Sequence, residues 1–348
     1  MRLNFFGDLS LYNIDYTKFQ YGEKLTELIN SAEYNIVNLE SVITNSLDKL
    51  ENQVANLSAS EKSEVLLEPF NIVSLANNHI QDYKNKGIYD TLDILNKNSI
   101  MYFGIGNSQK EALKPLLIEE NGYKIALFGA TRYANALGDS KLGTAHDKIS
   151  ILVKQIKELK RDGYFVIPYF HWGYEYVRIP SPRERKIARR CIDAGADLII
   201  GSHSHIYQCI EEYKGKLIAY SLGNFVFHSS VYNTLSPVKN DIRLKESFLV
   251  SIKINKNNSY TYKLHSYQLN NNGVELCNPT KNLEIISELN NVSKILSASK
   301  CKYLKAYYKQ TYDISQQNIK VRKDFQEIKK KSLKDKFHIY SKANLQDI

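Results

Sequence analysis

One stretch, residues 191–227, constrains the fold more than any other part of the chain. Its run Ala196–Ile200 is short and apolar, and it follows a helical pattern that closes at Gly195. Such a run is typical of a buried strand in an α/β sheet. His203 and His205 come shortly after it, and in an extended segment side chains two residues apart face the same side. The stretch therefore predicts two imidazoles directed at one spot beyond a strand.

A metal site is the interpretation that this pattern favours. Neutral imidazole is a common ligand for divalent metals, and open α/β sheets bind their ligands just beyond the carboxyl ends of the strands. An isolated His-Ser-His triplet is more often a polar loop, so the choice depends on the other polar side chains that follow predicted strands. These side chains are Asp8, Glu40, Asn78, His79 and His171. Taken singly, Asp8 also fits a helix cap, and His171 also fits core packing beside the single tryptophan.

Strand and helix patterns alternate along most of the chain, which predicts an α/β fold with helices on the outside. Phe248–Ile254 and Tyr260–Tyr267 alternate as an antiparallel hairpin, which we expect at the edge of the second sheet. The other predicted strands are Leu3–Phe6, Asn35–Leu39, Asn71–Ala76, Met101–Gly104, Tyr123–Phe128, Tyr164–Phe170 and Leu217–Leu222, and the predicted helices include Tyr21–Asn30, Ile149–Arg161 and Arg183–Asp193.

The pattern changes near residue 275, which predicts two parts: a domain over 1–275 and a helical, basic extension over 276–348. The chain has a formal net charge of +10, and part of the excess lies in Arg322, Lys323 and residues 329–331. This charge is compatible with an anionic polymer, a phosphoester or an anionic lipid surface. Nucleic acid is disfavoured because such a run is typical of a solvated helix face.

The four cysteines are scattered without a CxxC pair, which predicts reduced thiols rather than a disulfide framework. The first ten residues lack the apolar core of a signal peptide, and no apolar run is long enough to span a bilayer. We therefore expect no transmembrane segment and a cytoplasmic location, with attachment to a membrane surface as the alternative.

Further polar or aromatic residues near the predicted strand ends are candidates for supporting the site or binding substrate. Asp82 has the position to orient a metal-binding histidine, and Arg132 has the charge to bind an anionic group, although a surface turn and a solvated arginine are equally good interpretations. The full set is Asn77, Asp82, Arg132, Trp172, Glu175 and Asn224.

Six motifs occur in an order that resembles the capsule-synthesis protein CapA (PGA_cap) family. They are GDL at 7–9, NLE at 38–40, LANNH at 75–79, HWGYEY at 171–176, DAGADLIIGSHSH at 193–205 and YSLGNFVF at 220–227. The resemblance covers residues 3 to about 230. It implies a calcineurin-like metallophosphoesterase fold, a four-layer αββα sandwich with two metals at the sheet edge, here followed by a helical C-terminal appendage.

The resemblance also implies roles for individual residues. Asp8, Glu40 and His205 would hold one divalent ion, Asn78, His171 and His203 would hold the other, and Glu40 would bridge the two. His79 would donate a proton or stabilise the transition state. Such ligands suit manganese, zinc and iron alike. Leu9 and Ser10 stand where metallophosphoesterases usually continue with Asp-x-His, so the first site lacks one imidazole.

Three functions remain open from the sequence. The first is a metal-dependent, phosphoesterase-like hydrolase in capsule, polyglutamate or surface-polysaccharide biosynthesis. The second is an amide-bond enzyme acting on a γ-glutamyl polymer, because a binuclear centre also polarises carbonyl groups. The third is a non-catalytic assembly subunit that docks on a polymer synthase through its basic helices.

Overall fold

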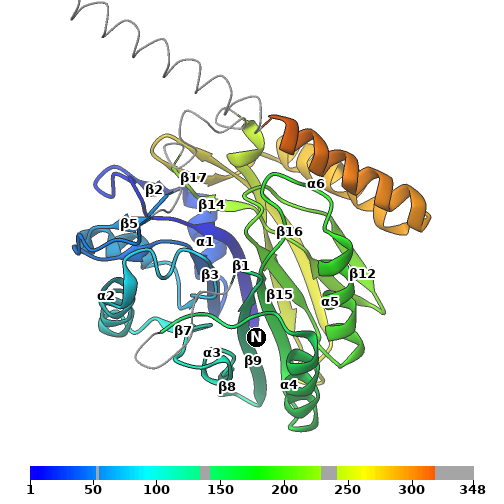
Figure 1. Cartoon of the computed structure of the whole chain (residues 1–348), viewed down its shortest axis with the longest axis horizontal. Coiled ribbons are helices and arrows are strands. Elements are labelled where there is room, and N and C mark those ends of the chain that lie inside the picture. The colour runs from blue at the N-terminus through cyan, green and yellow to red at the C-terminus, as the bar shows by residue number, and fades with distance from the viewer. Residues whose placement is uncertain (52–54, 134–141, 229–240, 318–348) are drawn as a thin grey trace, which may run out of the picture.

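Two mixed β-sheets form the centre of the molecule, with helices on the outside (Figure 1). The computed structural model describes residues 1–51, 55–133, 142–228 and 241–317. Within these residues the α/β class predicted from the sequence is confirmed. The basic residues Arg322, Lys323 and 329–331 lie outside the described part of the chain.

The larger sheet has nine strands, and β1 (Arg2–Leu9) lies near its middle. β1 runs parallel to β3 (Tyr34–Leu39) and antiparallel to β15 (Glu246–Ile254). The sheet order is β2-β17-β16-β15-β1-β3-β6-β7, and β14 pairs with β1 off this path. The remaining strands are β2 (Gln20–Tyr21), β6 (Ile72–Ser74), β7 (Met101–Phe103), β14 (Asn224–Val226), β16 (Tyr260–Asn270) and β17 (Gly273–Leu276).

The smaller sheet has six strands in the order β12-β13-β11-β10-β9-β8. Its centre is parallel, and every residue of β10 (Phe165–His171) is buried, as expected of a strand covered on both faces. The other strands are β8 (Leu116–Glu120), β9 (Tyr123–Thr131), β11 (Ile199–Ser202), β12 (Ile210–Tyr213) and β13 (Lys216–Ala219), and β4 (Val42–Ile43) and β5 (Ser58–Ala59) form a separate pair.

Apolar side chains gather in three large clusters that show how the sheets and helices pack. One cluster joins both sheets through residues such as Phe5 and Ile167, and the other two lie under helices on their outer faces. The helices are α1 (Glu23–Asn30), α2 (Lys84–Lys97), the short α3 (Gln109–Ala112), α4 (Ile149–Arg161), α5 (Pro182–Asp193) and α6 (Pro279–Ser293). Short 3₁₀ turns cover Glu61–Leu67, Ile242–Leu244 and Lys294–Ser297.

Local sequence explains the two helices that cover the six-stranded sheet. In α4, Leu152, Ile156 and Leu159 recur at helical spacing and are buried. In α5, Ser181 and Glu184 form a reciprocal capping box at a start that also carries Pro182. The two helices predicted over these segments are therefore present.

The predicted hairpin forms, but its expected place at the edge of the second sheet is wrong. β15 pairs with β1 over Arg2–Phe5, so the hairpin extends the nine-stranded sheet that begins with β1. Alternation in a hairpin predicts that its two strands pair with each other, but it does not say which third strand they join.

The C-terminal helices pack onto the body of the molecule. Ile285 and Leu289 of α6 belong to the cluster that joins the sheets, and Tyr303 and Tyr307 of the helix over 300–317 pack beneath α5. Arg178 forms an ion pair with Glu288, 2.5 Å away. A boundary at residue 275 stays a proposal, and no helix among the described residues combines the length and apolar character needed to cross a bilayer.

Candidate metal centre

Eight of the predicted site residues lie at or just beyond strand ends along one edge of the facing sheets. Parallel strands bring their carboxyl ends to one edge, which explains how residues far apart in the sequence meet. Asp8 lies near the end of β1, Glu40 follows β3, Asn78 and His79 follow β6, His171 ends β10, His203 and His205 follow β11, and Asn224 begins β14.

A close approach of two backbones joins the first and last of these strands. A Cβ on Gly7 would lie 1.8 Å from the carbonyl oxygen of Gly223, so only glycine allows β1 and β14 to come this close. The amide of Asp8 donates to that same oxygen at 2.9 Å, and Asp8 lies in register with Asn224. The glycines of two motifs therefore have a structural role in assembling the site.

The segment that carries His203 and His205 is not extended, contrary to the expectation from its spacing. The backbone angle φ is 93° at His203 and 58° at His205, so both residues adopt left-handed conformations that non-glycine residues rarely take. Both imidazoles still reach the cluster, with ring centroids 6.0 Å apart. Strained backbone of this kind is typical of functional sites.

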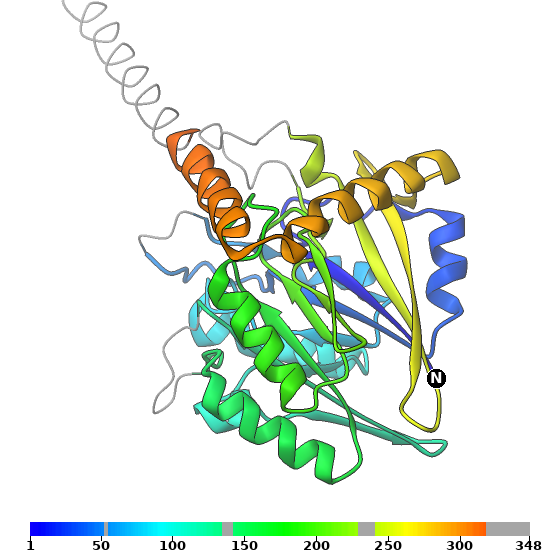
Figure 2. The same ribbon diagram turned by 90° about the vertical axis from the view of Figure 1, so that its right-hand side faces the viewer.

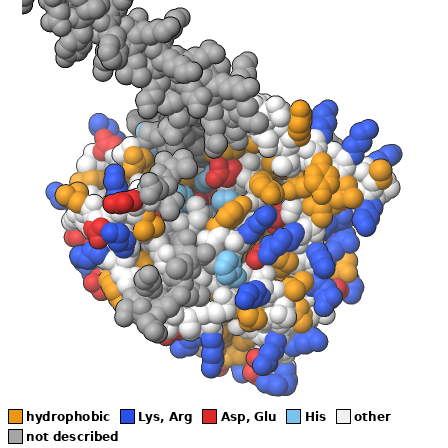
Figure 3. Space-filling view, viewed as in Figure 1, with side chains coloured by type: hydrophobic (Ala, Val, Ile, Leu, Met, Phe, Trp, Pro, Cys, Tyr) orange, Lys and Arg blue, Asp and Glu red, His pale blue; other side chains and the backbone are white. Residues whose placement is uncertain are grey.

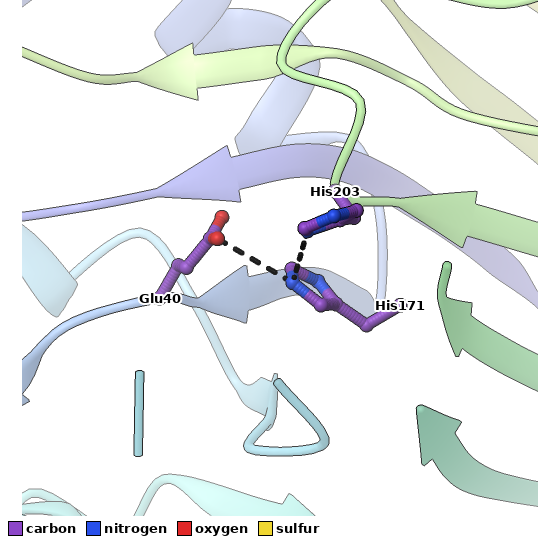
Figure 4. Close-up of side chains that lie close together, drawn as sticks. All are labelled: Glu40, His171 and His203. Carbon is purple, nitrogen blue, oxygen red and sulfur yellow. Dashed lines mark hydrogen bonds and ion pairs between the residues drawn. The ribbon is translucent and has the colours of Figure 1, made fainter. Parts of the chain in front are cut away.

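The first ligand group comprises Glu40, His171 and His203 (Figure 4). His171 Nε2 lies 3.0 Å from His203 Nδ1 and 3.4 Å from a Glu40 oxygen. The carboxamide oxygen of Asn78 lies 2.6 Å from the same nitrogen. Ligand atoms about 2.0–2.2 Å from one ion lie roughly 3–3.5 Å from each other, so this spacing suits a bound cation.

The second group comprises Asp8, Glu40 and His205, so the two groups share Glu40. His205 Nδ1 lies 4.0 Å from an Asp8 oxygen and 3.0 Å from the side-chain oxygen of Asn224. The contact with Asn224 fixes the orientation of the His205 ring. The structure thus groups the residues as the family resemblance implies, while their role as ligands stays a prediction.

The carboxyl groups in this cluster are buried with too few hydrogen-bond donors around them. Both oxygens of Glu40 are buried, and neither has a hydrogen-bond donor among the described residues. Burial and then the Glu40 charge raise the pKa of Asp8 to about 8, and burial also raises the pKa of Glu40. Burial lowers the pKa of His171 and of His203 far below the ordinary value, so both rings are neutral. Neutral imidazoles around two desolvated carboxylates form a donor set that fits a divalent cation.

His79 lies beside this cluster and has a carboxylate partner of its own. Its Nδ1 is 2.7 Å from Asp82, whose same oxygen accepts the Leu57 amide at 2.6 Å. Burial disfavours the charged ring, but the hydrogen bond to Asp82 and the nearby carboxylate charges together outweigh burial, and the pKa of His79 is raised. The arrangement leaves the opposite nitrogen of His79 available to exchange a proton.

One residue at the centre of the polar network, Asn38, was absent from the sequence predictions. Its side chain donates to Asp8 at 2.8 Å and lies 3.3 Å from His171, and its oxygen accepts from Asn77. Asn77 in turn accepts the His79 amide at 3.0 Å. A polar residue inside the apolar strand just before Glu40 was the available signal for Asn38.

The remaining predicted residues are divided between the site and the core. Arg132 follows β9, donates its amide to the His171 carbonyl, and lies 3.7 Å from buried Glu184. Glu175 is exposed and acts electrostatically on Glu40 and His79. Trp172 was predicted to support the site or bind substrate, but it stacks on Phe170 within the apolar cluster under α4 and α5.

Tyr133 is a second residue that the sequence predictions missed. Its ring centroid lies 4.3 Å from that of His203, so it covers one face of a candidate ligand. Nothing in the local sequence distinguishes it from the other 24 tyrosines.

Two curated relatives of the chain are named for PGA biosynthesis and for capsule biosynthesis. The chain is 32% identical to the PGA biosynthesis protein CapA of Bacillus subtilis (strain 168), covering 71% of this chain and 63% of the relative. It is 36% identical to the capsule biosynthesis protein CapA of Bacillus anthracis, covering 49% and 44% respectively. The matched region therefore spans less than two thirds of the length of either relative.

Two solved structures show distant likeness. The TT1561 protein of Thermus thermophilus matches with a TM-score of 0.37 at 10% identity, over 75% of this chain and 97% of that protein. The 5'-nucleotidase of Candida albicans SC5314 matches with a TM-score of 0.43 at 11% identity, over 92% and 57%. The family model for the bacterial capsule synthesis protein PGA_cap matches residues 3–229, which is more than half of the sequence, and the chain therefore belongs to this family.

Proposed function

We propose that this protein is a metal-dependent, phosphoesterase-like hydrolase acting in capsule, polyglutamate or surface-polysaccharide biosynthesis. The observation that carries the proposal is the pair of buried ligand groups that share Glu40, whose two oxygens have no donor in the described protein. The proposal includes the four-layer αββα arrangement, which the apolar clusters between and outside the sheets support. Capsule and PGA synthesis are the processes named for the curated relatives.

In this proposal Asp8 and His205 would hold one ion, His171, His203 and Asn78 would hold a second, and Glu40 belongs to both ligand groups. When bound, divalent ions would supply Lewis-acid polarisation of a phosphoryl or carbonyl oxygen. Manganese, zinc and iron all suit imidazole, carboxamide and carboxylate ligands. The two lowered imidazole pKa values favour binding because a metal competes only with a weakly held proton.

The protein's own residues supply the proton transfer and the substrate contact. Asp82 keeps a proton on Nδ1 of His79, so the raised pKa leaves His79 able to protonate a leaving group through Nε2. The side chain of Arg132 is 32% exposed beside Glu184 and would offer its guanidinium to an anionic substrate.

Metal content and metal-stimulated turnover of a generic phosphodiester test this function in one preparation. We expect about two divalent ions per chain in the parent protein, and loss of both metal and turnover in Glu40→Gln. His79→Gln should retain the metal and lose about 10²–10⁴-fold in kcat, the contribution typical of a general acid. His146→Gln, an exposed residue outside both ligand groups, is the matched control. A metal-free, inactive parent protein would contradict the proposal.

A second candidate keeps the same ligands and changes the bond to the amide of a γ-glutamyl polymer. The name of the Bacillus subtilis relative favours this substrate, and the binuclear chemistry also suits a carbonyl group. Comparing a phosphodiester with a γ-glutamyl oligomer in the same metal-loaded preparation separates the two. If His79→Gln and His203→Gln variants support polymer production as well as the parent, the protein is a non-catalytic partner of a polymer synthase.

A further inference from the structure

A groove on the outer face of the nine-stranded sheet gathers cations at the end of β1 opposite the candidate metal centre. It has a volume of about 280 Å³ and lies between α1 and strands β1, β15 and β16. Figure 2 shows α1 running beside the yellow strands β15 and β16. Arg2, Lys253 and Lys263 line the groove together with His265, and no carboxylate is among its described lining residues.

The three cations face one another across the sheet. Arg2 on β1 lies directly opposite Lys253 on β15, and Lys253 lies opposite Thr261 on β16, two residues before Lys263. All three side chains therefore share one face, with directly opposed Cβ atoms about 5 Å apart and diagonal neighbours about 7–8 Å apart. Like charges placed directly opposite are destabilising.

Neighbouring groups offset only part of this charge. The carboxylate of Glu33 accepts the backbone amide of Arg2 at 2.7 Å, but the side chains of Arg2, Lys253 and Lys263 form no ion pair with any described residue. Burial and then the Lys263 charge lower the pKa of His265, which also lines the groove. The groove thus has a positive potential that a bound anion would offset.

We propose that this groove binds a linear polyanion whose charges are carboxylates. The lining residues and the strand register support binding of an anion in the groove. The choice of a carboxylate polymer rests on the proposed function. The groove is a hollow between α1 and the strands, which an extended chain enters more closely than a flat bilayer surface does. Tyr262 is the single aromatic residue among the described lining residues, whereas single-stranded nucleic acids bind to platforms of several stacked aromatic rings.

The groove and the metal centre are separate sites on one sheet. Arg2 and Asp8 occur at opposite ends of β1, and six residues of strand span about 20 Å. A polymer held in the groove is therefore bound at a segment remote from the reacting bond. Such tethering raises the local concentration of the rest of the polymer around the protein.

Binding of fluorescent poly-γ-glutamate to the full-length chain tests the proposal. We expect Lys253→Gln/Lys263→Gln to weaken binding about tenfold at low salt, because each charge-assisted contact contributes modestly at an exposed site. Lys157→Gln/Lys186→Gln removes the same charge from exposed positions on α4 and α5 and should leave the affinity within about twofold. Equal losses in the two double variants would show binding to net charge alone and overturn the proposal.

Three further measurements keep the test decisive. The groove variant should unfold at the same or a higher temperature than the parent at low salt, because it relieves like-charge repulsion, so weakened binding with unchanged stability supports the groove. Single-stranded DNA and anionic vesicles are tested as competitors against unlabelled poly-γ-glutamate. If either displaces the fluorescent polymer at a lower concentration of negative charge than poly-γ-glutamate does, the carboxylate assignment is overturned. Glu40→Gln should still bind the polymer; retained binding without turnover supports the groove even if the hydrolase function fails.

Discussion

Buried carboxylates without hydrogen-bond donors are costly, and at the scale of single residues Glu40 has the largest such deficit in the described part of the protein. Both of its oxygens lack a donor, and Asp8 lies in the same buried cluster. Removing charges from water is compensated only by an opposite charge or by a proton. Neutral histidines supply neither, which is why a cation is the partner that fits.

Replacing Glu40 by glutamine should therefore separate metal binding from folding. In the metal-free state we expect Glu40→Gln to be as stable as the parent or more stable, because it removes a desolvated acid. Manganese at a hundred times its dissociation constant should stabilise the parent by about 2.7 kcal/mol and leave the variant unchanged. Thermal unfolding with and without metal measures both effects, and an equal shift in the variant would contradict the assignment.

The stability of the metal-free protein should fall as pH rises from 7 to 8. Over this range the folded protein keeps the proton on Asp8, whose pKa is raised from 3.8 to about 8, while the unfolded chain has released it. Each retained proton lowers the free energy of unfolding by up to about 1.4 kcal/mol per pH unit. His79, whose pKa is also raised, acts in the same direction. His171 and His203 act the other way because only the unfolded chain protonates them, but above pH 7 this holds for no more than about a quarter of each ring.

Urea unfolding at several pH values, with and without metal, measures this slope. Asp8→Asn should make it shallower, and bound metal should flatten it because metal displaces the proton. A metal-free protein that gains stability between pH 7 and 8 would be inconsistent with the buried acids.

The candidate ligands could be predicted individually because each follows a strand whose apolar run is visible in the sequence. Asn38 could not, because its importance comes from contacts with Asp8 and His171, which only the fold brings together. Trp172 shows the opposite error. It directly follows His171 in the chain, but adjacent residues at a strand end point to opposite faces, so its ring enters the core.

At the scale of elements, periodicity predicts a segment better than it predicts its neighbours. The helix over Ile149–Arg161 occurs with its predicted bounds, because its buried positions recur at helical spacing. The predicted position of the β15–β16 hairpin, at the edge of the second sheet, was wrong because β15 pairs with β1. The packing of α6 against the cluster that joins the sheets is visible only in three dimensions. Contacts between distant segments depend on shape, which a local pattern does not contain.

Two leucines of α6 test whether this helix is part of the fold. Leu289 is fully buried and Leu283 is 69% exposed, although both lie on the same helix. We expect Leu289→Ala to lower the free energy of unfolding by about 2–5 kcal/mol, the cost of a buried leucine truncation, and Leu283→Ala to change it by less than about 0.5 kcal/mol. Equal, small effects in denaturant titrations would show that α6 is dispensable for the fold.

At the scale of the whole molecule, two sheets bring their strand ends together at one edge, and this arrangement assembles the candidate centre. Lys and Arg side chains are spread over the face formed by α4, α5 and α6 (Figure 3). The positive charge is therefore not confined to the C-terminal residues in which the sequence concentrates it. The groove beside α1 differs from this face because its cations have no acidic neighbours in the lining.

Anomalous diffraction from crystals soaked with manganese tests the central claim most directly. We expect two peaks of anomalous density, one beside Asp8 and His205 and the other beside His171 and His203, with Glu40 contacting both. Crystals of Glu40→Gln, grown and soaked in the same way, should show neither peak at full occupancy. Strong peaks elsewhere on the protein, with no density between these residues in the parent, would contradict the claim.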